Sequence, residues 1–529
     1  MASLSDHPDA WDRIDPTFTA LPHRRLAEAA LARARDFGVD HADFRFERVR
    51  YQYFTVRDGQ LQGASDSEDL GFAVRVLHEG AWGFASGVVL SRDAAVVVAE
   101  QAVRVAQVAG RMTRRRVELA PEPVHDDVAW CSPYLVNPLE VPLEEKVDLF
   151  RDWTSRLLAA DGVDHASGGL QAVQENKFYA DETGTMTTQQ RVRLEPHLEA
   201  FGADEASGRF DSMRTIAPPV GRGWEFVADG GYDFEAEVEQ IPGLLREKLL
   251  APSVEPGAYD LVIHPSNLFL TIHESIGHAT ELDRALGYEA NYAGTSFATY
   301  DRLNSLVYGS PVMQVTGDRT VEHGLASIGY DDEGVQTQSW DIVRDGILVG
   351  YQLDRPMAHT YGAELNGGRS NGCAFADSPG HIPIQRMANV SLQPDPHGPD
   401  TDGLIDKVER GIYVVGDKSW SIDMQRFNFQ FTGQRFYRIE DGKLAGMLRD
   451  VAYQGTTTDF WGSMEAVGGP QTYVLHGAFN CGKAQPGQVA AVSHGCPSAL
   501  FRGVNVLNTS EEGGSLEPVD APGDEAVAE

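Results

Sequence analysis

Apolar and polar positions follow two different patterns along the first part of the chain. The alanine-rich segment RRLAEAALARARDF, residues 24–37, predicts a helix that stops at Gly38. The next segment, ADFRFERVRYQYFTVRDGQ, residues 42–60, alternates with a period of two and ends in the dipeptide Asp58-Gly59. This alternation predicts a strand that enters a tight hairpin turn.

Further along, the chain continues to mix helical and strand patterns. GFAVRVLHEGAWGFASG, residues 71–87, predicts two strands joined at Glu79-Gly80, and a helix follows at about Ala94 to Val108. A proline-rich stretch, residues 119–145, is typical of a linker. The segment from 143 to 252 then predicts a helix, alternating strands and a final amphipathic helix.

The region from about residue 257 to 508 is mostly strand and turn. DIVRDGILVGYQLD, residues 341–354, and FYRIEDGKLAGMLRD, residues 436–450, are both Asp-Gly hairpin patterns. We therefore expect an α+β fold, with an N-terminal α/β region followed by a β-rich, mostly antiparallel C-terminal domain. The expected segments are a tail (1–19), an N-terminal α/β domain (20–120), a middle α/β segment (121–256), the β-rich domain (257–508) and an acidic disordered tail (509–529).

Composition excludes several classes of function. The formal net charge of −34 over 529 residues would repel phosphate backbones and anionic lipid, so we expect no direct nucleic-acid partner and no membrane partner. Cationic or neutral peptides and metal cations remain compatible with this charge. Only four cysteines occur and no secretory signal is recognised, so we expect a cytoplasmic protein without a disulfide framework.

The segment TIHESIGHATE, residues 271–281, carries the strongest candidate chemistry. His273 and His278 are five residues apart, and in a regular α-helix their side chains would point about 140° away from each other. A shared metal ion therefore requires a distorted helix, and one extra residue in a turn, a π-bulge, would bring both imidazoles onto one face. Gly277 precedes the second histidine and predicts a flexible position at which this distortion occurs.

A carboxylate beside two histidine ligands has a definable task. Glu274 would take the proton of a zinc-bound water and pass it to the leaving amine of a peptide. Catalytic zinc usually keeps three protein ligands, so one is missing. The residues alone leave Glu281, Cys481 and Cys496 as candidates for this third ligand, and Lys483 near Cys481 as a group that would hold a thiolate or orient a substrate carbonyl.

The order of several motifs resembles one known family. HESIGHATE (273–281), the segment 330–354, GRSNG (368–372), PIQRMANVSL (383–392) and NCGKAQPGQ (480–488) together look like the TldD/PmbA family of modulators of DNA gyrase. The resemblance covers nearly the whole chain. Because the HExxxH motif is retained, this chain is similar to the TldD-type catalytic subunit.

This resemblance implies a zinc metallopeptidase that cuts unfolded or extended peptides. It implies that His273, His278 and Cys481 are the zinc ligands and that Glu274 is the catalytic acid/base. It also implies a dimer, either of two copies or with a paralogue that lacks the metal motif.

Two alternatives to this interpretation stay open from the sequence. One is a cysteine hydrolase with Cys481 as the nucleophile and His273 or His494 as the base. The other is a non-catalytic regulatory protein with a structural zinc, whose fourth ligand would be Glu281 or Cys496. Three further residues are candidates for substrate contact or loop support: Arg369, Asn371 and Tyr330.

Overall fold

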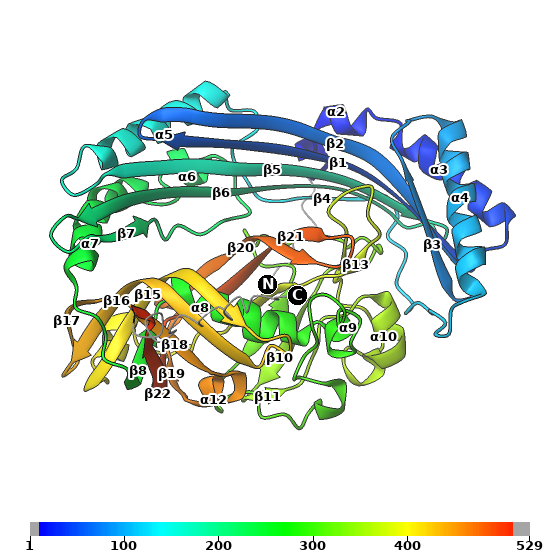
Figure 1. Cartoon of the computed structure of the whole chain (residues 1–529). Helices are drawn as coiled ribbons and strands as arrows, with labels where there is room; N and C mark the ends of the chain where they lie inside the picture. Colours follow the sequence, from blue (N-terminus) through cyan, green and yellow to red (C-terminus); the bar gives the residue numbers. More distant parts are fainter. Residues whose placement is uncertain (1–9, 511–529) are drawn as a thin grey trace, which may run out of the picture.

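The computed structural model describes residues 10–510, which form two halves that face each other (Figure 1). Residues 10–19, expected as part of a tail, form two short helices, α1 (Ala10–Arg13) and α2 (Pro16–Thr19). The predicted disorder of the acidic C-terminal tail lies outside the described residues from position 511 onward.

The N-terminal half is built on one long, curved sheet that arches over the rest of the molecule (Figure 1). Its strands are β1 (His41–Arg57), β2 (Gln60–His78), β3 (Ala81–Gly87), β4 (Val128–Cys131), β5 (His165–Asp181), β6 (Met186–Asp204) and β7 (Arg209–Arg214). The order is β3-β2-β1-β5-β6-β4, with β7 also paired to β6, and only the β4–β6 pairing is parallel. The segments 20–120 and 121–256 therefore contribute strands to the same sheet.

The period-two pattern of β1 decides which residues face each side of this sheet. Phe44 and Phe54 belong to the two apolar clusters beneath the helices. Arg45 and Tyr51, at alternating positions, point to the other side and contact the C-terminal half. The helices that cover the sheet are α3 (His23–Asp36), α4 (Arg92–Gly110), α5 (Leu143–Leu158), α6 (Glu225–Ala228) and α7 (Phe234–Leu250).

The C-terminal half is β-rich and mostly antiparallel, as the sequence predicted. One seven-stranded sheet has the order β15-β8-β22-β18-β16-β17, with β19 paired to β22. Its strands are β8 (Gly257–Ile263), β15 (Arg410–Ile422), β16 (Asn428–Glu440), β17 (Lys443–Leu448), β18 (Val451–Thr456), β19 (Met464–Val467) and β22 (Ala499–Asn508). The predicted α+β class is confirmed.

Smaller sheets and short helices complete this half. A four-stranded sheet has the order β11-β10-β9-β14, and β12–β13 and β20–β21 are two-stranded. The strands are β9 (Val315–Asp318), β10 (Ser339–Arg344), β11 (Ile347–Leu348), β12 (Ala374–Phe375), β13 (Ile384–Gln385), β14 (Asn389–Leu392), β20 (Val474–Lys483) and β21 (Gln488–Cys496). The helices are α8 (Pro265–Ile272), α9 (Leu282–Ala285), α10 (Arg355–Tyr361), α11 (Thr401–Ile405) and α12 (Thr457–Gly462).

The Asp-Gly hairpins are confirmed at all three predicted turns. Asp58-Gly59 joins β1 to β2, Asp345-Gly346 joins β10 to β11, and Asp441-Gly442 joins β16 to β17. Both residues of each turn have positive φ, between 48° and 76°. This is the backbone of a primed turn, whose twist matches that of the flanking strands and which Asp-Gly adopts readily.

The two halves are joined by buried ion pairs beneath the curved sheet. Lys177 of β5 lies 2.7 Å from Asp332, and Arg75 of β2 lies 2.9 Å from Glu333. Removing one partner of such a pair would leave an uncompensated buried charge, so these contacts fix where the C-terminal half sits under the sheet. Among residues 10–510, no helix is long and apolar enough to cross a membrane.

Candidate metal centre

Helix α8 carries the first histidine into the centre of the C-terminal half. It begins at Pro265, and the ring nitrogen Nδ1 of His264 accepts a hydrogen bond from the backbone N–H of Ser266 (3.2 Å). Proline at the first position and a side-chain acceptor before it are typical of a helix start. Every residue of α8 is buried, and the helix leads directly into His273.

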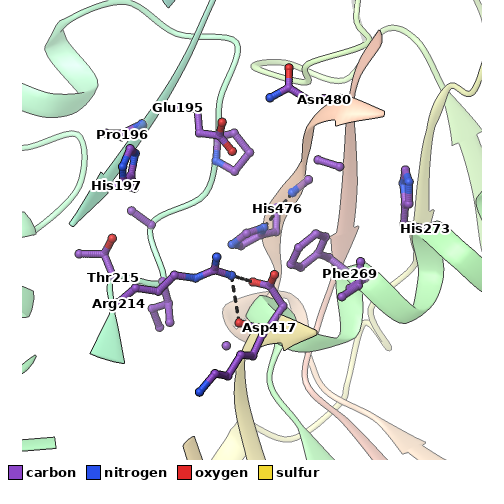
Figure 2. A pocket seen from close by; sticks show the side chains of 18 of the residues that line it. Glu195, Pro196, His197, Arg214, Thr215, Phe269, His273, Asp417, His476 and Asn480 are labelled. Carbon is purple, nitrogen blue, oxygen red and sulfur yellow. Dashed lines mark hydrogen bonds and ion pairs between the residues drawn. The ribbon is translucent and has the colours of Figure 1, made fainter. Parts of the chain in front are cut away.

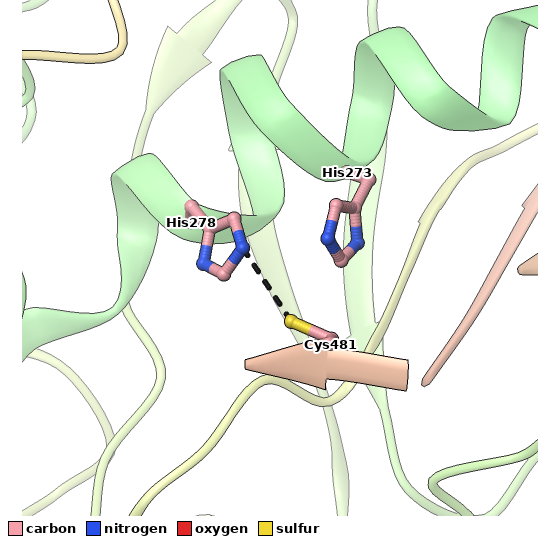
Figure 3. A group of neighbouring side chains, drawn as sticks. All are labelled: His273, His278 and Cys481. Carbon is pink, nitrogen blue, oxygen red and sulfur yellow. Dashed lines mark hydrogen bonds between the residues drawn. The ribbon is translucent and has the colours of Figure 1, made fainter. Parts of the chain in front are cut away.

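The helix is distorted where the spacing of the two histidines required it. Residues His273–Gly277 form a π-helical turn, in which the N–H of His278 donates to the carbonyl of His273. The extra residue brings the two rings together, with centroids 4.7 Å apart (Figure 3). The predicted distortion between His273 and His278 is confirmed.

Side chains compensate for the hydrogen bonds that the wide turn disturbs. The hydroxyl of Tyr308 donates to the carbonyl of Ser275 (2.5 Å), and the hydroxyl of Thr280 donates to that of Ile276 (2.8 Å). The amide of Gln352 donates to the carbonyl of Gly277 (2.7 Å). These donors satisfy buried carbonyls that would otherwise cost free energy, so the distortion is built into the fold.

The reason for glycine at position 277 differs from the one expected. Gly277 has an ordinary helical φ of −53°, so no unusual backbone freedom is used there. A Cβ at this position would lie 2.5 Å from Sδ of Met387 and 3.4 Å from Cε1 of His494. Glycine is required because other side chains approach the turn closely, which corrects the expectation of a flexible hinge.

Cys481 completes a cluster of three metal-type donors. It lies on β20, where the β20–β21 register shifts between Ala478 and Cys481, and its Sγ is 3.5 Å from Nε2 of His278 (Figure 3). One donor atom from each of His273, His278 and Cys481 lies within 4.8 Å of the others, and all three residues are buried. The guanidinium of Arg386 fixes the strand by donating to the carbonyl of Cys481 (2.6 Å).

The charge state of the thiol suits a ligand. Burial opposes the thiolate, but His278 and Arg386 hold the pKa of Cys481 below its usual value. Two imidazoles and a thiolate form a donor set that zinc accepts. The other cysteine candidate differs: Cys496 packs its Sγ 3.8 Å from the carbonyl of Pro265, and burial raises the pKa of its thiol.

Each histidine has a partner on the ring nitrogen that faces away from the cluster. Nδ1 of His278 lies 2.9 Å from Oε2 of Glu281, and Nδ1 of His273 lies 2.7 Å from Nε2 of His494. A hydrogen bond at Nδ1 leaves the Nε2 lone pair free for a metal, and such outer partners are usual around metal-binding histidines. Glu281 is therefore placed behind His278, outside the cluster of three donors.

Glu274 is positioned as an ionised carboxylate next to the cluster. It is 6% exposed, and its Oε2 lies 2.5 Å from Nη1 of Arg426, in the turn that joins β15 to β16. Burial would raise the pKa of Glu274, but the two cluster histidines and Arg426 hold it below its usual value. No local signal in the sequence connected Arg426 with the motif 152 residues earlier.

Lys483 makes its hydrogen bonds to groups other than the thiol of Cys481. Its ammonium group is fully buried and donates to Glu281 (3.1 Å), Asp283 (2.8 Å) and the carbonyl of Gln385 (2.8 Å). It neutralises Glu281, and together with His278 it holds the pKa of that carboxyl well below its usual value despite burial. Lys483 thus supports the partner of a histidine and does not face the cluster.

The three remaining candidates lie away from the cluster. Arg369 pairs with Glu122 (2.8 Å), and the buried amide of Asn371 accepts from the N–H of Leu353 (2.8 Å). The ring of Tyr330 packs 4.8 Å from that of His125. Of the two roles left open, the structure places Asn371 in loop support, and none of the three lines the cavity at the metal site.

A cavity of about 300 Å³ opens onto this cluster from the space between the two halves (Figure 2). His273 and Cys481 line one end, and Glu195, His197 and Arg214 of the curved sheet line the other. Phe269 stacks on His476 between them, with ring centroids 4.1 Å apart. A chain segment in this cavity would contact both the cluster and the sheet.

Comparison with family models gives two matches in this chain. Residues 256–508 match the PmbA/TldA metallopeptidase C-terminal domain, and residues 42–106 match PmbA/TldA metallopeptidase domain 1. Together the matched segments span more than half of the chain and include all three cluster residues.

Similar proteins agree with these matches. A metalloprotease of Methanocaldococcus jannaschii is 26% identical over 81% of this chain and 89% of its own length. A zinc metalloprotease TldD homolog of Saccharolobus solfataricus is 23% identical over 90% of this chain and 98% of its own length.

Two solved structures share the fold. A protein of Thermotoga maritima described as a modulator of a DNA gyrase has a TM-score of 0.72 at 16% identity, covering 92% of this chain and 100% of its own. TldE from Thermococcus kodakarensis has a TM-score of 0.67 at 18% identity, covering 91% of this chain and 99% of its own.

Proposed function

Because this chain belongs to the PmbA/TldD family of metallopeptidases, we propose that it is a zinc-dependent peptidase that hydrolyses extended peptides. The observation that carries the proposal is the convergence of His273, His278 and Cys481 within 4.8 Å, beside the carboxylate of Glu274 and at the end of a cavity. These three residues would hold the zinc. Their donor types and the hydrogen bonds at both Nδ1 atoms fit this ion.

Zinc at such a site supplies Lewis acidity, which polarises a carbonyl and favours deprotonation of water. The chain's own residues supply the rest. Glu274, kept ionised by Arg426, takes a proton from the attacking water and returns it to the leaving amine. The first step needs a carboxylate that starts unprotonated, which is the state that Arg426 favours, and the second step donates the proton gained in the first.

The surroundings of the cluster favour extended substrates. The cluster is buried, and the cavity that reaches it is small, so a folded domain would not reach the donors. In the described part of the chain, β20 pairs only with β21, and several β20 residues line the cavity. A peptide would add to the free edge of β20 as a further strand, with its carbonyl next to Cys481.

The cysteine-hydrolase alternative has weaker support. His494 was one candidate base for Cys481, but its Nε2 is bound to His273 and its Nδ1 lies 2.8 Å from the carbonyl of Val390. Neither ring nitrogen is then free for the thiol. The structural-zinc alternative needs a fourth ligand, and no fourth donor joins the cluster among the residues that the structure describes.

We further infer a dimer as the working form. The fold is shared with TldE, whose name marks it as a relative of TldD, so the partner is either a second copy or a paralogue without the histidine motif. Mass measurement of the purified chain, alone and mixed with such a paralogue, distinguishes the two.

Metal removal combined with one substitution tests the proposed activity. Chelation should abolish cleavage of an unstructured peptide, and zinc should restore it. Glu274→Gln should keep its zinc but lose about 10²- to 10⁴-fold in kcat. Glu440→Gln, which changes an exposed carboxylate at the end of β16, serves as the matched control. Cleavage that survives chelation would instead support the cysteine mechanism.

A further inference from the structure

The cavity contains an acidic side chain on the opposite side from the metal cluster. Glu195 lies on β6 of the curved sheet, and Figure 2 shows it across the cavity from His273. Its neighbour on the same face, His197, also lines the cavity. The N-terminal half thus contributes a carboxylate to a space whose other end holds the proposed catalytic groups.

The carboxylate of Glu195 lacks a direct hydrogen-bonding or ion-pair partner in the described part of the chain, and Arg214 acts on it only through its charge. Among residues 10–510, the side chain of Glu195 makes no hydrogen bond and no ion pair. The basic groups near it are already engaged. Arg214 lies 2.5 Å from Asp417 and also donates to its backbone carbonyl (2.9 Å), and Lys418 lies 2.6 Å from Asp211. Both of these cations therefore form their ion pairs with aspartates and not with Glu195.

The environment makes an unpaired carboxylate costly. Burial, with a smaller contribution from Asp417, raises the pKa of Glu195 to about 7, although Arg214 acts in the opposite direction. Two of the histidines that line the cavity, His197 and His476, do not compensate, because burial lowers the pKa of His197 and lowers that of His476 to about 4. A cation brought in by a ligand would restore the favourable interaction that the fold leaves unmade.

The remaining surfaces suit a ligand with an apolar stem and a charged end. Pro196, the residue after Glu195, and Phe269, which lies between Glu195 and His273, also line the cavity. Apolar side chains of this kind cover the methylene groups of a lysine while its ammonium reaches a carboxylate. The net charge of −34 also attracts cationic peptides to the molecule as a whole.

We propose that Glu195 forms a subsite for a positively charged group of the bound peptide, either a lysine or arginine side chain or the free N-terminal ammonium. The subsite rests on the proposed peptidase function, because it places this group a short distance from the bond that is cut. It deepens that function by making the enzyme selective for cationic peptides. Selection then comes from the N-terminal half, whereas the metal and Glu274 lie in the C-terminal half.

A set of matched peptides tests the subsite with the full-length, zinc-loaded protein. Each peptide carries either lysine or its uncharged isostere norleucine at a single position, and this position differs from one pair of peptides to the next. Every peptide is made once with a free N-terminus and once with an acetylated one. Wild type should cleave the best cationic peptide with a kcat/KM about 10- to 100-fold above its uncharged match. Whether lysine or the free N-terminus produces this preference identifies the source of the charge.

Substitution of Glu195 separates this role from a structural one. Glu195→Gln should bring the preference close to one, by lowering kcat/KM for the cationic peptide about 10- to 100-fold. Glu199→Gln, on the same strand but outside the cavity, should keep the preference. A wild-type enzyme without preference, or a preference that survives in Glu195→Gln, overturns the proposal.

Binding to Glu274→Gln protein keeps the subsite distinguishable from the peptidase activity. Fluorescence anisotropy with the same peptides should show the same preference without turnover. Preferential binding without any cleavage by wild type would support the subsite and overturn the peptidase proposal. Cleavage by wild type without a charge preference in either assay would support the peptidase proposal and overturn the subsite.

Discussion

Nδ1 of His273 lies 2.7 Å from Nε2 of His494, and the other ring nitrogen of His494 lies 2.8 Å from the carbonyl of Val390. The carbonyl can only accept, so His494 donates from Nδ1 and accepts at Nε2. His273 must then carry its proton on Nδ1 and present the lone pair of Nε2 to the cluster. A third histidine thereby fixes the tautomer of the first.

This relay predicts that His494 affects metal affinity without touching the metal. His494→Phe removes the acceptor and should weaken zinc binding about 10- to 100-fold, because His273 loses its fixed orientation. His494→Gln offers an amide oxygen to His273 and should recover part of the affinity. Competition with a coloured chelator measures both. Equal affinities in wild type and His494→Phe would contradict the relay.

Glu281 is predicted to stabilise the fold as well as orient His278. Glu281→Gln would leave the buried cation Arg284 without its carboxylate and Lys483 with Asp283 alone. The free energy of unfolding should fall by about 3–5 kcal/mol, measured by denaturant on metal-free protein so that zinc does not contribute.

The matched control is Glu465→Gln, which removes an exposed partner of Arg502. It should change stability by about 1 kcal/mol or less. Equal effects of the two substitutions would show that the buried network around Glu281 does not carry the stability assigned to it.

The wide turn predicts a steric requirement at Gly277. Gly277→Ala places a methyl group 2.5 Å from Sδ of Met387, so it should destabilise the protein by about 1–3 kcal/mol and reduce zinc affinity by displacing His278. Gly243→Ala is the control, because no atom lies within 4 Å of the added carbon and alanine favours a helix. If Gly277→Ala binds zinc as tightly as wild type, the packing of Met387 against the turn does not hold His278 in place.

The raised pKa of Glu195 predicts how peptide preference depends on pH. Below its pKa of about 7 the carboxyl is protonated and neutral, so it no longer attracts a cation, whereas a lysine side chain stays charged. Arg214 of β7 and Asp417 of β15 face this group and lie 2.5 Å from each other.

The lysine-over-norleucine ratio should therefore rise from about pH 6 to about pH 8. The ratio cancels pH effects on the metal site, because both peptides experience them equally. The same measurement on Glu195→Gln should be flat. A wild-type ratio that does not change over this range would contradict a titrating Glu195 in the subsite.

Local patterns were sufficient for much of the fold and for the distorted turn between His273 and His278, whereas Cys481 was singled out only through the family resemblance. Alternation and Asp-Gly turns predicted the hairpins, because both signals depend on neighbouring residues alone. The five-residue spacing of His273 and His278 predicted a distorted helix, because helix geometry allows no other common face.

Residues that complete the site from distant strands could not be predicted. Arg426 reaches Glu274 across 152 positions, and Glu195 reaches the cavity from a different sheet. Such contacts depend on how whole sheets pack, and no local pattern encodes this. The pairing of Lys483 with Glu281 and Asp283 is a contact of the same kind, visible only in three dimensions.

The metal content of purified protein tests the central claim most directly. After dialysis against the same buffered zinc, wild type and Cys496→Ser should each hold about one zinc per chain, because Cys496 lies outside the cluster. Cys481→Ser should hold far less. Equal zinc in Cys481→Ser and wild type would contradict a site formed by His273, His278 and Cys481.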